Sequence, residues 1–217
     1  MGLRIKEERS LEYGVSSYVW VSPFTDETLS QLQHAKDIGF DIYEVAVENP
    51  DLINAELLKR TADEVGIKIY ICGAFGETRD IGSTKEEYRN NGVRYIKDLI
   101  DLAEAVESPI VSGPMYSATG RTELLNDSEK KKQRSLVVEN LIEVSEYGLN
   151  KGVKLAIEPL NRFETDMINT TQQGIELIAE VNRENVGLLL DTFHMNIEEK
   201  NIREAIKLSK GRLFNFH

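Results

Sequence analysis

Several features are scarce in this sequence of 217 residues. It has one cysteine, Cys72, so no internal disulfide can form, and we expect the chain to work in the reducing cytoplasm. No apolar run approaches the roughly 18 residues that cross a bilayer, so no membrane contact is expected. Lysine and arginine number 26 against 37 Asp and Glu. This balance argues against nucleic-acid binding, which needs clustered basic residues to neutralise phosphates.

Histidine is also rare. The three histidines, His34, His194 and His217, limit any metal site to few imidazole ligands, so carboxylates must supply the rest. The hydrophobic share of 41% and the charged share of 29% are those of an ordinary folded protein. The length is sufficient for one large domain with a real hydrophobic core.

Short apolar runs alternate with longer segments of helical spacing. Seven runs rich in Val, Ile, Leu, Tyr and Phe are typical of buried strands, at 13–18, 41–47, 68–72, 109–113, 153–158, 186–191 and 212–217. Six helices are predicted between them, at about 25–38, 54–65, 84–106, 128–151, 171–181 and 201–210. Thr84 with Glu87 has the spacing of a capping box at the start of the third helix.

Alternating strands and helices predict a parallel sheet with helices outside it. The two arrangements to consider are an open doubly wound sheet and a TIM (β/α)8-type barrel. No glycine-rich phosphate loop follows the first strand, which favours the barrel. A full barrel has about 250 residues. We therefore predict a barrel over 13–217 that is truncated after its seventh strand and lacks its last βα unit, preceded by a polar N-terminal extension over 1–12.

The predicted strands end in residues that can hold a metal ion. The fifth strand ends in Glu158, the sixth in Asp191 and the seventh in His217, while Glu44 lies near the end of the second. Active sites of barrels lie at this end of the strands. An ionised carboxylate at the end of an apolar strand is costly without a partner. A shared divalent cation would satisfy all three side chains, and two carboxylates with one imidazole suit Mn2+, Mg2+ or Co2+.

Further polar residues follow the fifth and sixth strands. Glu164 and His194 are placed to reach a substrate at the same rim of the barrel. Arg162 is expected to form an ion pair that holds its loop in place.

Two stretches resemble a known family. The segments EPLNRFE (158–164) and DTFHMNIEE (191–199) are similar to those of the ketose 3-epimerases, the D-tagatose, D-psicose and L-ribulose 3-epimerases of the xylose isomerase-like barrels. The resemblance implies metal-dependent inversion of C3 of a free ketose in carbohydrate metabolism, through an enediolate, with Mn2+ or alternatively Co2+ or Mg2+. It also implies a homo-oligomer.

The resemblance assigns a role to each residue at the rim. Glu158, Asp191 and His217 would be the metal ligands, and Glu158 would also be a catalytic carboxylate. Glu164 and His194 would bind the substrate around O1 and O2.

The sequence also departs from this family. A fourth ligand, a Glu on the eighth strand that serves as the opposite base, and an Arg a few residues past His217 have no counterpart in the 217 residues. Near Thr119 the tryptophan often found in relatives is missing. We therefore expect weak Mn2+ binding and little epimerisation of D-fructose or D-tagatose by this chain. Robust turnover would point to another base, with Glu44 the first to mutate.

Two alternatives stay open at this point. One is an aldose–ketose isomerase similar to hydroxypyruvate isomerase, which moves a proton between C1 and C2. The other is a truncated, non-catalytic barrel that binds metal or sugar. The endonuclease IV group, which shares the barrel, needs many His ligands for three zinc ions, and three histidines in an acidic chain argue against it.

Overall fold

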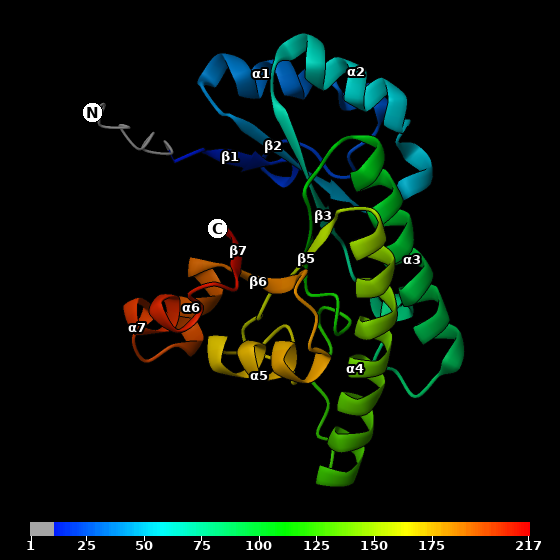
Figure 1. The fold of residues 1–217 in the computed structure, drawn as a ribbon, viewed down its shortest axis with the longest axis vertical. Helices are drawn as coiled ribbons and strands as arrows, with labels where there is room; N and C mark the ends of the chain where they lie inside the picture. Colours follow the sequence, from blue (N-terminus) through cyan, green and yellow to red (C-terminus); the bar gives the residue numbers. More distant parts are fainter. Residues whose placement is uncertain (1–10) are drawn as a thin grey trace, which may run out of the picture.

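The computed structural model describes residues 11–217, and its centre is one parallel sheet in which every strand lies beside its neighbour in sequence (Figure 1). The strands run in the order β1 to β7. Their bounds are Gly14–Ser16, Ile42–Val47, Lys68–Gly73, Ile110–Gly113, Lys154–Ile157, Val186–Leu190 and Leu213–Phe216. All seven predicted strands are therefore present, and the prediction of a parallel barrel-type sheet is confirmed.

Within residues 11–217, seven α-helices accompany this sheet. They are α1 to α7, at Ser30–Ile38, Ala55–Val65, Glu86–Ala105, Asp127–Asn150, Thr171–Val181, Thr192–Glu198 and Ile202–Leu208. The helix that the sequence count missed is α6, which follows β6 directly. The capping box expected at Thr84 is wrong: α3 begins after Lys85, whose side chain makes no cap hydrogen bond.

The sheet curls but does not close over the described residues. β1 pairs with β2 and β7 pairs with β6, and neither forms a second pair within residues 11–217. A cavity of about 820 Å³ lies between these two edges, lined by apolar side chains and by Glu44 and His217. The structure is thus a half-open barrel of seven strands. Of the extension expected over 1–12, residues 1–10 lie outside the described part, and Glu12 forms an ion pair with Lys68 of β3.

The inner face of the sheet changes from apolar to polar along the strands. Ile110, Ala156 and Leu189 form a small buried cluster of their own, flanked by Tyr70 and Phe214. Side chains two residues apart on a strand point to the same face. The inner positions that come next along the chain are therefore the polar or ionisable residues Glu44, Cys72, Ser112, Glu158 and Asp191.

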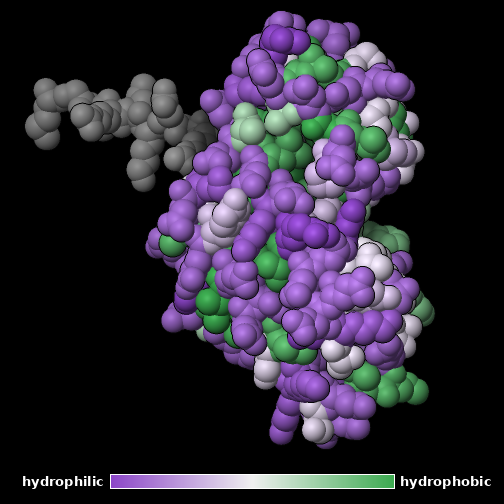
Figure 2. Space-filling view, turned by 90° about the vertical axis from the view of Figure 1, so that its right-hand side faces the viewer, coloured by the Kyte–Doolittle hydropathy of each residue, from purple (hydrophilic) through white to green (hydrophobic). Residues whose placement is uncertain are grey.

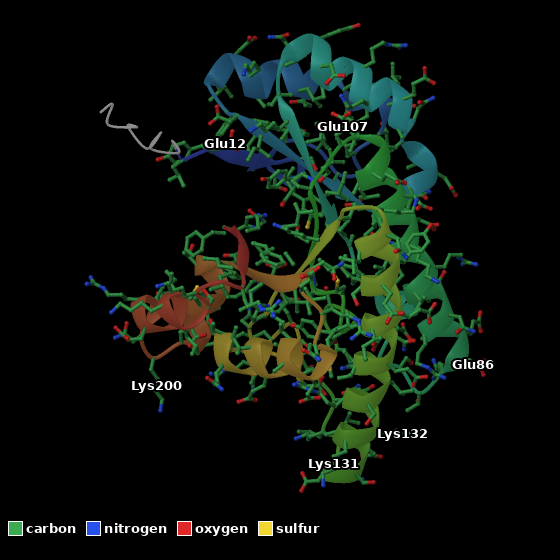
Figure 3. All side chains as sticks on the ribbon, in the orientation of Figure 1. Glu12, Glu86, Glu107, Lys131, Lys132 and Lys200 are labelled. Carbon is green, nitrogen blue, oxygen red and sulfur yellow. The ribbon has the colours of Figure 1, made fainter. Side chains whose placement is uncertain are left out.

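The outer face of the sheet packs against the helices in a large continuous core. Beyond the helices the surface is largely hydrophilic, with hydrophobic residues in separate patches (Figure 2). Charged residues such as Glu86 on α3, Lys132 on α4 and Lys200 after α6 extend away from the ribbon (Figure 3). Among residues 11–217, no helix combines the length and the apolar character that spanning a membrane requires.

One glycine allows β6 and β7 to approach closely. A Cβ on Gly187 would lie 2.5 Å from the carbonyl oxygen of Arg212 and 2.6 Å from the ring of Phe214. Such distances are far below van der Waals contact, so a side chain here would push β7 away from β6.

We therefore expect Gly187→Ala to lower the free energy of unfolding by about 1–3 kcal/mol, because the backbone of β7 must move. Gly76→Ala is the matched control, since a Cβ there would meet no atom within 4 Å and the backbone φ is −93°. Urea denaturation of both variants measures the difference. Equal stability of the two would show that the contact is not tight in solution.

Candidate metal and substrate site

The site is built where β5 and β6 end. Glu158 follows the last residue of β5 and is 8% exposed. Asp191 follows β6 and is the N-cap of α6, where its Oδ1 accepts a hydrogen bond of 2.6 Å from the N–H of Phe193. The two strands are paired in parallel, so their ends bring both carboxylates to the same rim.

Three side chains converge closely at this rim. Ligand atoms of Glu158, Asp191 and His194 all lie within 4.8 Å of one another. The structure thus brings together Glu158 and Asp191, the two carboxylates predicted as metal ligands. The third member of the group is His194, which was expected to contact the substrate.

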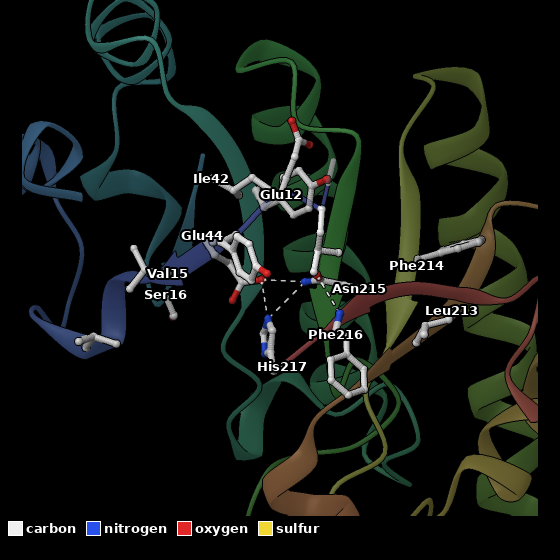
Figure 4. A pocket seen from close by; sticks show the side chains of 15 residues that line it. Glu12, Val15, Ser16, Ile42, Glu44, Leu213, Phe214, Asn215, Phe216 and His217 are labelled. Atoms are coloured by element: carbon white, nitrogen blue, oxygen red, sulfur yellow. Dashed lines mark hydrogen bonds and ion pairs between the residues drawn. The ribbon is translucent and has the colours of Figure 1, made fainter. Parts of the chain in front are cut away.

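The other predicted ligand, His217, lies beside the group with its ring turned to β2. Its backbone N–H donates to the carbonyl oxygen of Leu190 at 2.9 Å, and its carbonyl oxygen accepts from the N–H of Thr192 at 2.9 Å. Its Nε2 is 3.2 Å from Oε2 of Glu44 and 3.3 Å from Nδ2 of Asn215 (Figure 4). Nδ1 is therefore the ring nitrogen that stays open to a cation.

Glu44 is a residue whose role the sequence analysis left undefined. Its side chain is 6% exposed, and Oε2 also accepts from the hydroxyl of Ser112 at 3.3 Å and from Nδ2 of Asn215 at 3.2 Å. A carboxylate that holds a ligating histidine by the second ring nitrogen is a common support of metal sites. The sequence signal for this role was the position of Glu44 two residues after Ile42, which places both side chains on the inner face of β2.

The electrostatics of the rim favour an added positive charge. The pKa of Glu158 is raised to about 8, chiefly by burial; the charge of His217 opposes this rise, and the carboxylates of Asp191 and Glu44 add to it. Burial alone would lower the pKa of His217, but the hydrogen bond to Glu44 and the charges of Glu44, Glu158 and Asp191 outweigh it and raise this pKa to about 9. Carboxylates with one imidazole fit a hard divalent cation such as Mn2+ or Mg2+.

His194 and Glu164 lie at the outer side of the rim. Burial lowers the pKa of His194, and the charges of Asp191 and Glu164 partly offset this effect. Nδ1 of His194 accepts hydrogen bonds from the backbone N–H and the side-chain amide of Asn161 at 3.1 and 2.9 Å. The backbone N–H of Glu164 donates to the carbonyl oxygen of Asn161 at 2.9 Å, so Asn161 and Glu164 belong to one tight turn.

The two sequence stretches that resemble the epimerases hold each other in place. Arg162 forms a bidentate ion pair with Glu198 at 2.8 Å for each contact, as expected of a residue that fixes its loop. Glu199 accepts a hydrogen bond of 2.7 Å from the N–H of Thr171 at the start of α5. The glutamates at the end of DTFHMNIEE are thus structural, and they lock α6 to the loop after β5 and to α5.

The raised pKa of Glu158 generates a prediction about stability. Folding favours the protonated carboxyl, so its contribution is fully present below pH ~4.5 and is lost as the pH rises through about 8. At pH 8, in EDTA, we expect Glu158→Gln to melt about 5 °C above the parent chain, the shift expected from about 1–2 kcal/mol in a domain of this size. The gain should vanish near pH 5. Glu64→Gln, at an exposed position on α2, is the control, and scanning calorimetry is the measurement.

Comparisons with known proteins identify the family of this chain. The model of the xylose isomerase-like TIM barrel family matches residues 32–217. A probable ketose 3-epimerase of Synechocystis sp. is 30% identical over 207 residues, covering 95% of this chain and 71% of the relative. A 3-dehydro-D-guloside 4-epimerase of Escherichia coli is 29% identical, covering 89% and 74%.

A solved structure has a similar fold. The D-allulose 3-epimerase from Methylomonas sp., crystallised with D-allulose, superposes with a TM-score of 0.90 at 27% identity, covering 95% of this chain and 71% of that one. These relatives are epimerases, which are enzymes of the isomerase class. The chain belongs to the xylose isomerase-like TIM barrel family.

Proposed function

We propose that this chain acts on a free keto-sugar and inverts its configuration at C3 with the help of a divalent cation, most simply Mn2+. The observation that carries the proposal is the pair of carboxylates at adjacent strand ends, the buried Glu158 and the half-buried Asp191. The ketose 3-epimerases among the relatives support the choice of substrate and carbon atom. A cytoplasmic location and a homo-oligomeric state remain predictions from the sequence.

Glu158, Asp191 and His217 would hold the cation, with His217 using Nδ1 because Nε2 is engaged by Glu44 and Asn215. A bound cation would supply positive charge beside the ketone oxygen, where negative charge develops when the C3 proton leaves. The same positive charge would keep Glu158 ionised near neutral pH despite its burial, so that it can accept a proton.

In this scheme Glu158 removes the C3 proton, and Glu164 and His194 hold the oxygens at the O1 and O2 end of the sugar. Inversion also requires an acid on the opposite face of the sugar, because one carboxylate that returns its own proton restores the starting configuration. Glu44 is the buried carboxylate on the facing part of the inner sheet, but its Oε2 is already held by Ser112, Asn215 and His217. We therefore expect proton abstraction to be faster than inversion.

Isotope exchange tests the reaction. The chain is incubated with Mn2+ and D-fructose in D2O, and we expect deuterium at C3 to accumulate faster than D-psicose forms. Glu158→Gln should reduce the exchange by a factor of about 100 or more, as expected for loss of a general base. The control Glu64→Gln should exchange like the parent chain.

The other outcomes of this assay identify the alternatives. Deuterium at C1 together with an aldose product would contradict C3 chemistry and indicate an aldose–ketose isomerase. Binding of Mn2+ and D-fructose without exchange at any carbon would indicate a non-catalytic barrel. Exchange at C4 of a 3-keto glycoside, where C4 lies next to the ketone, without exchange at C3 of D-fructose would agree instead with the 4-epimerase relative.

The ligand set has its own test. His217→Gln should weaken Mn2+ binding by about tenfold or more, because a ligand is lost, whereas His194→Gln should change it less than threefold. Isothermal titration with Mn2+ at pH 7.5 measures both, and His34→Gln on α1 is the matched control. The reverse order would make His194 the ligand and would refute the assignment of His217.

A further inference from the structure

Asn161 is an uncharged residue at the centre of the site whose polar groups all have partners. It is 2% exposed. Its backbone N–H and its Nδ2 both donate to Nδ1 of His194, at 3.1 and 2.9 Å. Its Oδ1 accepts from the N–H of Phe163 at 2.9 Å. Because that backbone group is only a donor, Oδ1 must face it, and the orientation of the side-chain amide is fixed.

These contacts determine which nitrogen of His194 carries the proton. A nitrogen that accepts from two donors cannot itself hold a hydrogen, so Nδ1 is unprotonated. The neutral ring then carries its proton on Nε2. Nε2 lies 3.7 Å from Oε1 of Glu158, which is too long for a hydrogen bond. Within residues 11–217 this N–H has no acceptor, and it faces the space beside the two carboxylates.

The contact between Asn161 and His194 is held from both sides. The neighbouring Arg162 is clamped to Glu198 at the end of α6, the helix that carries His194. The N–H of Arg162 also donates to Glu198, at 2.7 Å. The loop therefore keeps its donors against Nδ1, and a ring that exchanged its two nitrogens would lose both hydrogen bonds from Asn161.

We propose that Asn161 is a positioning residue that fixes His194 as a hydrogen-bond donor, so that Nε2–H binds an oxygen of the keto-sugar and does not ligate the cation. A metal ion needs a nitrogen lone pair, and the one on His194 is occupied by Asn161. The identity of the accepting oxygen rests on the proposed function, whereas the position of the proton does not. The arrangement gives the two histidines different tasks: one lone pair is directed to the cation, and one N–H to the substrate.

The first test observes the proton directly. A chain labelled with 15N-histidine contains three imidazoles, and the variants His34→Gln and His217→Gln assign the signals of His194. We expect a protonated Nε2 and an unprotonated Nδ1, unchanged by Mg2+ as a diamagnetic cation and shifted at Nε2 by D-fructose added with Mg2+. A protonated Nδ1, or loss of the Nε2 proton when Mg2+ binds, would overturn the proposal.

The second test changes the partner. Asn161→Asp has the same shape, but it places a carboxylate oxygen against Nδ1 and should move the proton to that nitrogen. We expect the 15N pattern to change and the KM for the ketose to rise about tenfold, the cost of one hydrogen bond to a neutral group. Asn169→Asp is the matched control, because Nδ2 of Asn169 donates to the carbonyl oxygens of Leu160 and Thr165 and not to a histidine.

The outcomes separate this proposal from the proposed function. An unchanged 15N pattern in Asn161→Asp, or an equal rise of KM in Asn169→Asp, would refute the role of Asn161 even if the chain is a good epimerase. If the parent chain shows the expected tautomer of His194 but exchanges no ketose proton, the proposed function is contradicted, and the assignment of the proton to Nε2 of His194 is supported. If Asn161→Asp does not fold, the 15N signals of His194 in the parent chain, with and without Mg2+, decide whether the proton is fixed on Nε2.

Discussion

Burial of carboxylates at the end of an otherwise apolar barrel is the constraint on which the rest of this structure depends. The buried Glu44 and Glu158 and the half-buried Asp191 follow the apolar cluster of Ile110, Ala156 and Leu189 along the strands, where little water can stabilise the charge of the two glutamates. Protonation of Glu158 and the charge on a nearby imidazole relieve the repulsion in the protein alone. A cation would relieve it more completely, which makes charge balance the physical basis of a metal-dependent reaction.

The fold and the main carboxylates could be predicted because they follow from local patterns. Apolar runs separated by helical segments define a parallel sheet, and the side-chain alternation of strands places Glu158 and Asp191 on the inner face two residues after Ala156 and Leu189. Both conclusions need only the order of residues along one strand. The neighbour relations of successive strands then bring the two side chains to the same rim without further information.

Other parts of the site could not be predicted because they depend on contacts between segments far apart in the sequence. The direction of the His217 ring is set by Glu44, which is 173 residues away. The orientation of His194 is set by Asn161 of a different loop. The helix α6 was missed because it has only seven residues, and its ends are fixed by Asp191 at its start and by contacts of Glu198 with Arg162, not by a strong internal pattern.

This short helix has a consequence for how the protein can move. α6 is joined at one end to β6 through Asp191, and at the other to the turn after β5 and to α5 through two adjacent glutamates. These contacts fix the position of α6 relative to β6, to the turn after β5 and to α5. If the rim opens to admit a sugar, we expect segments other than α6 to move. The first candidates are the segments around β1, for which the described part of the chain shows no hydrogen bond or ion pair to α6.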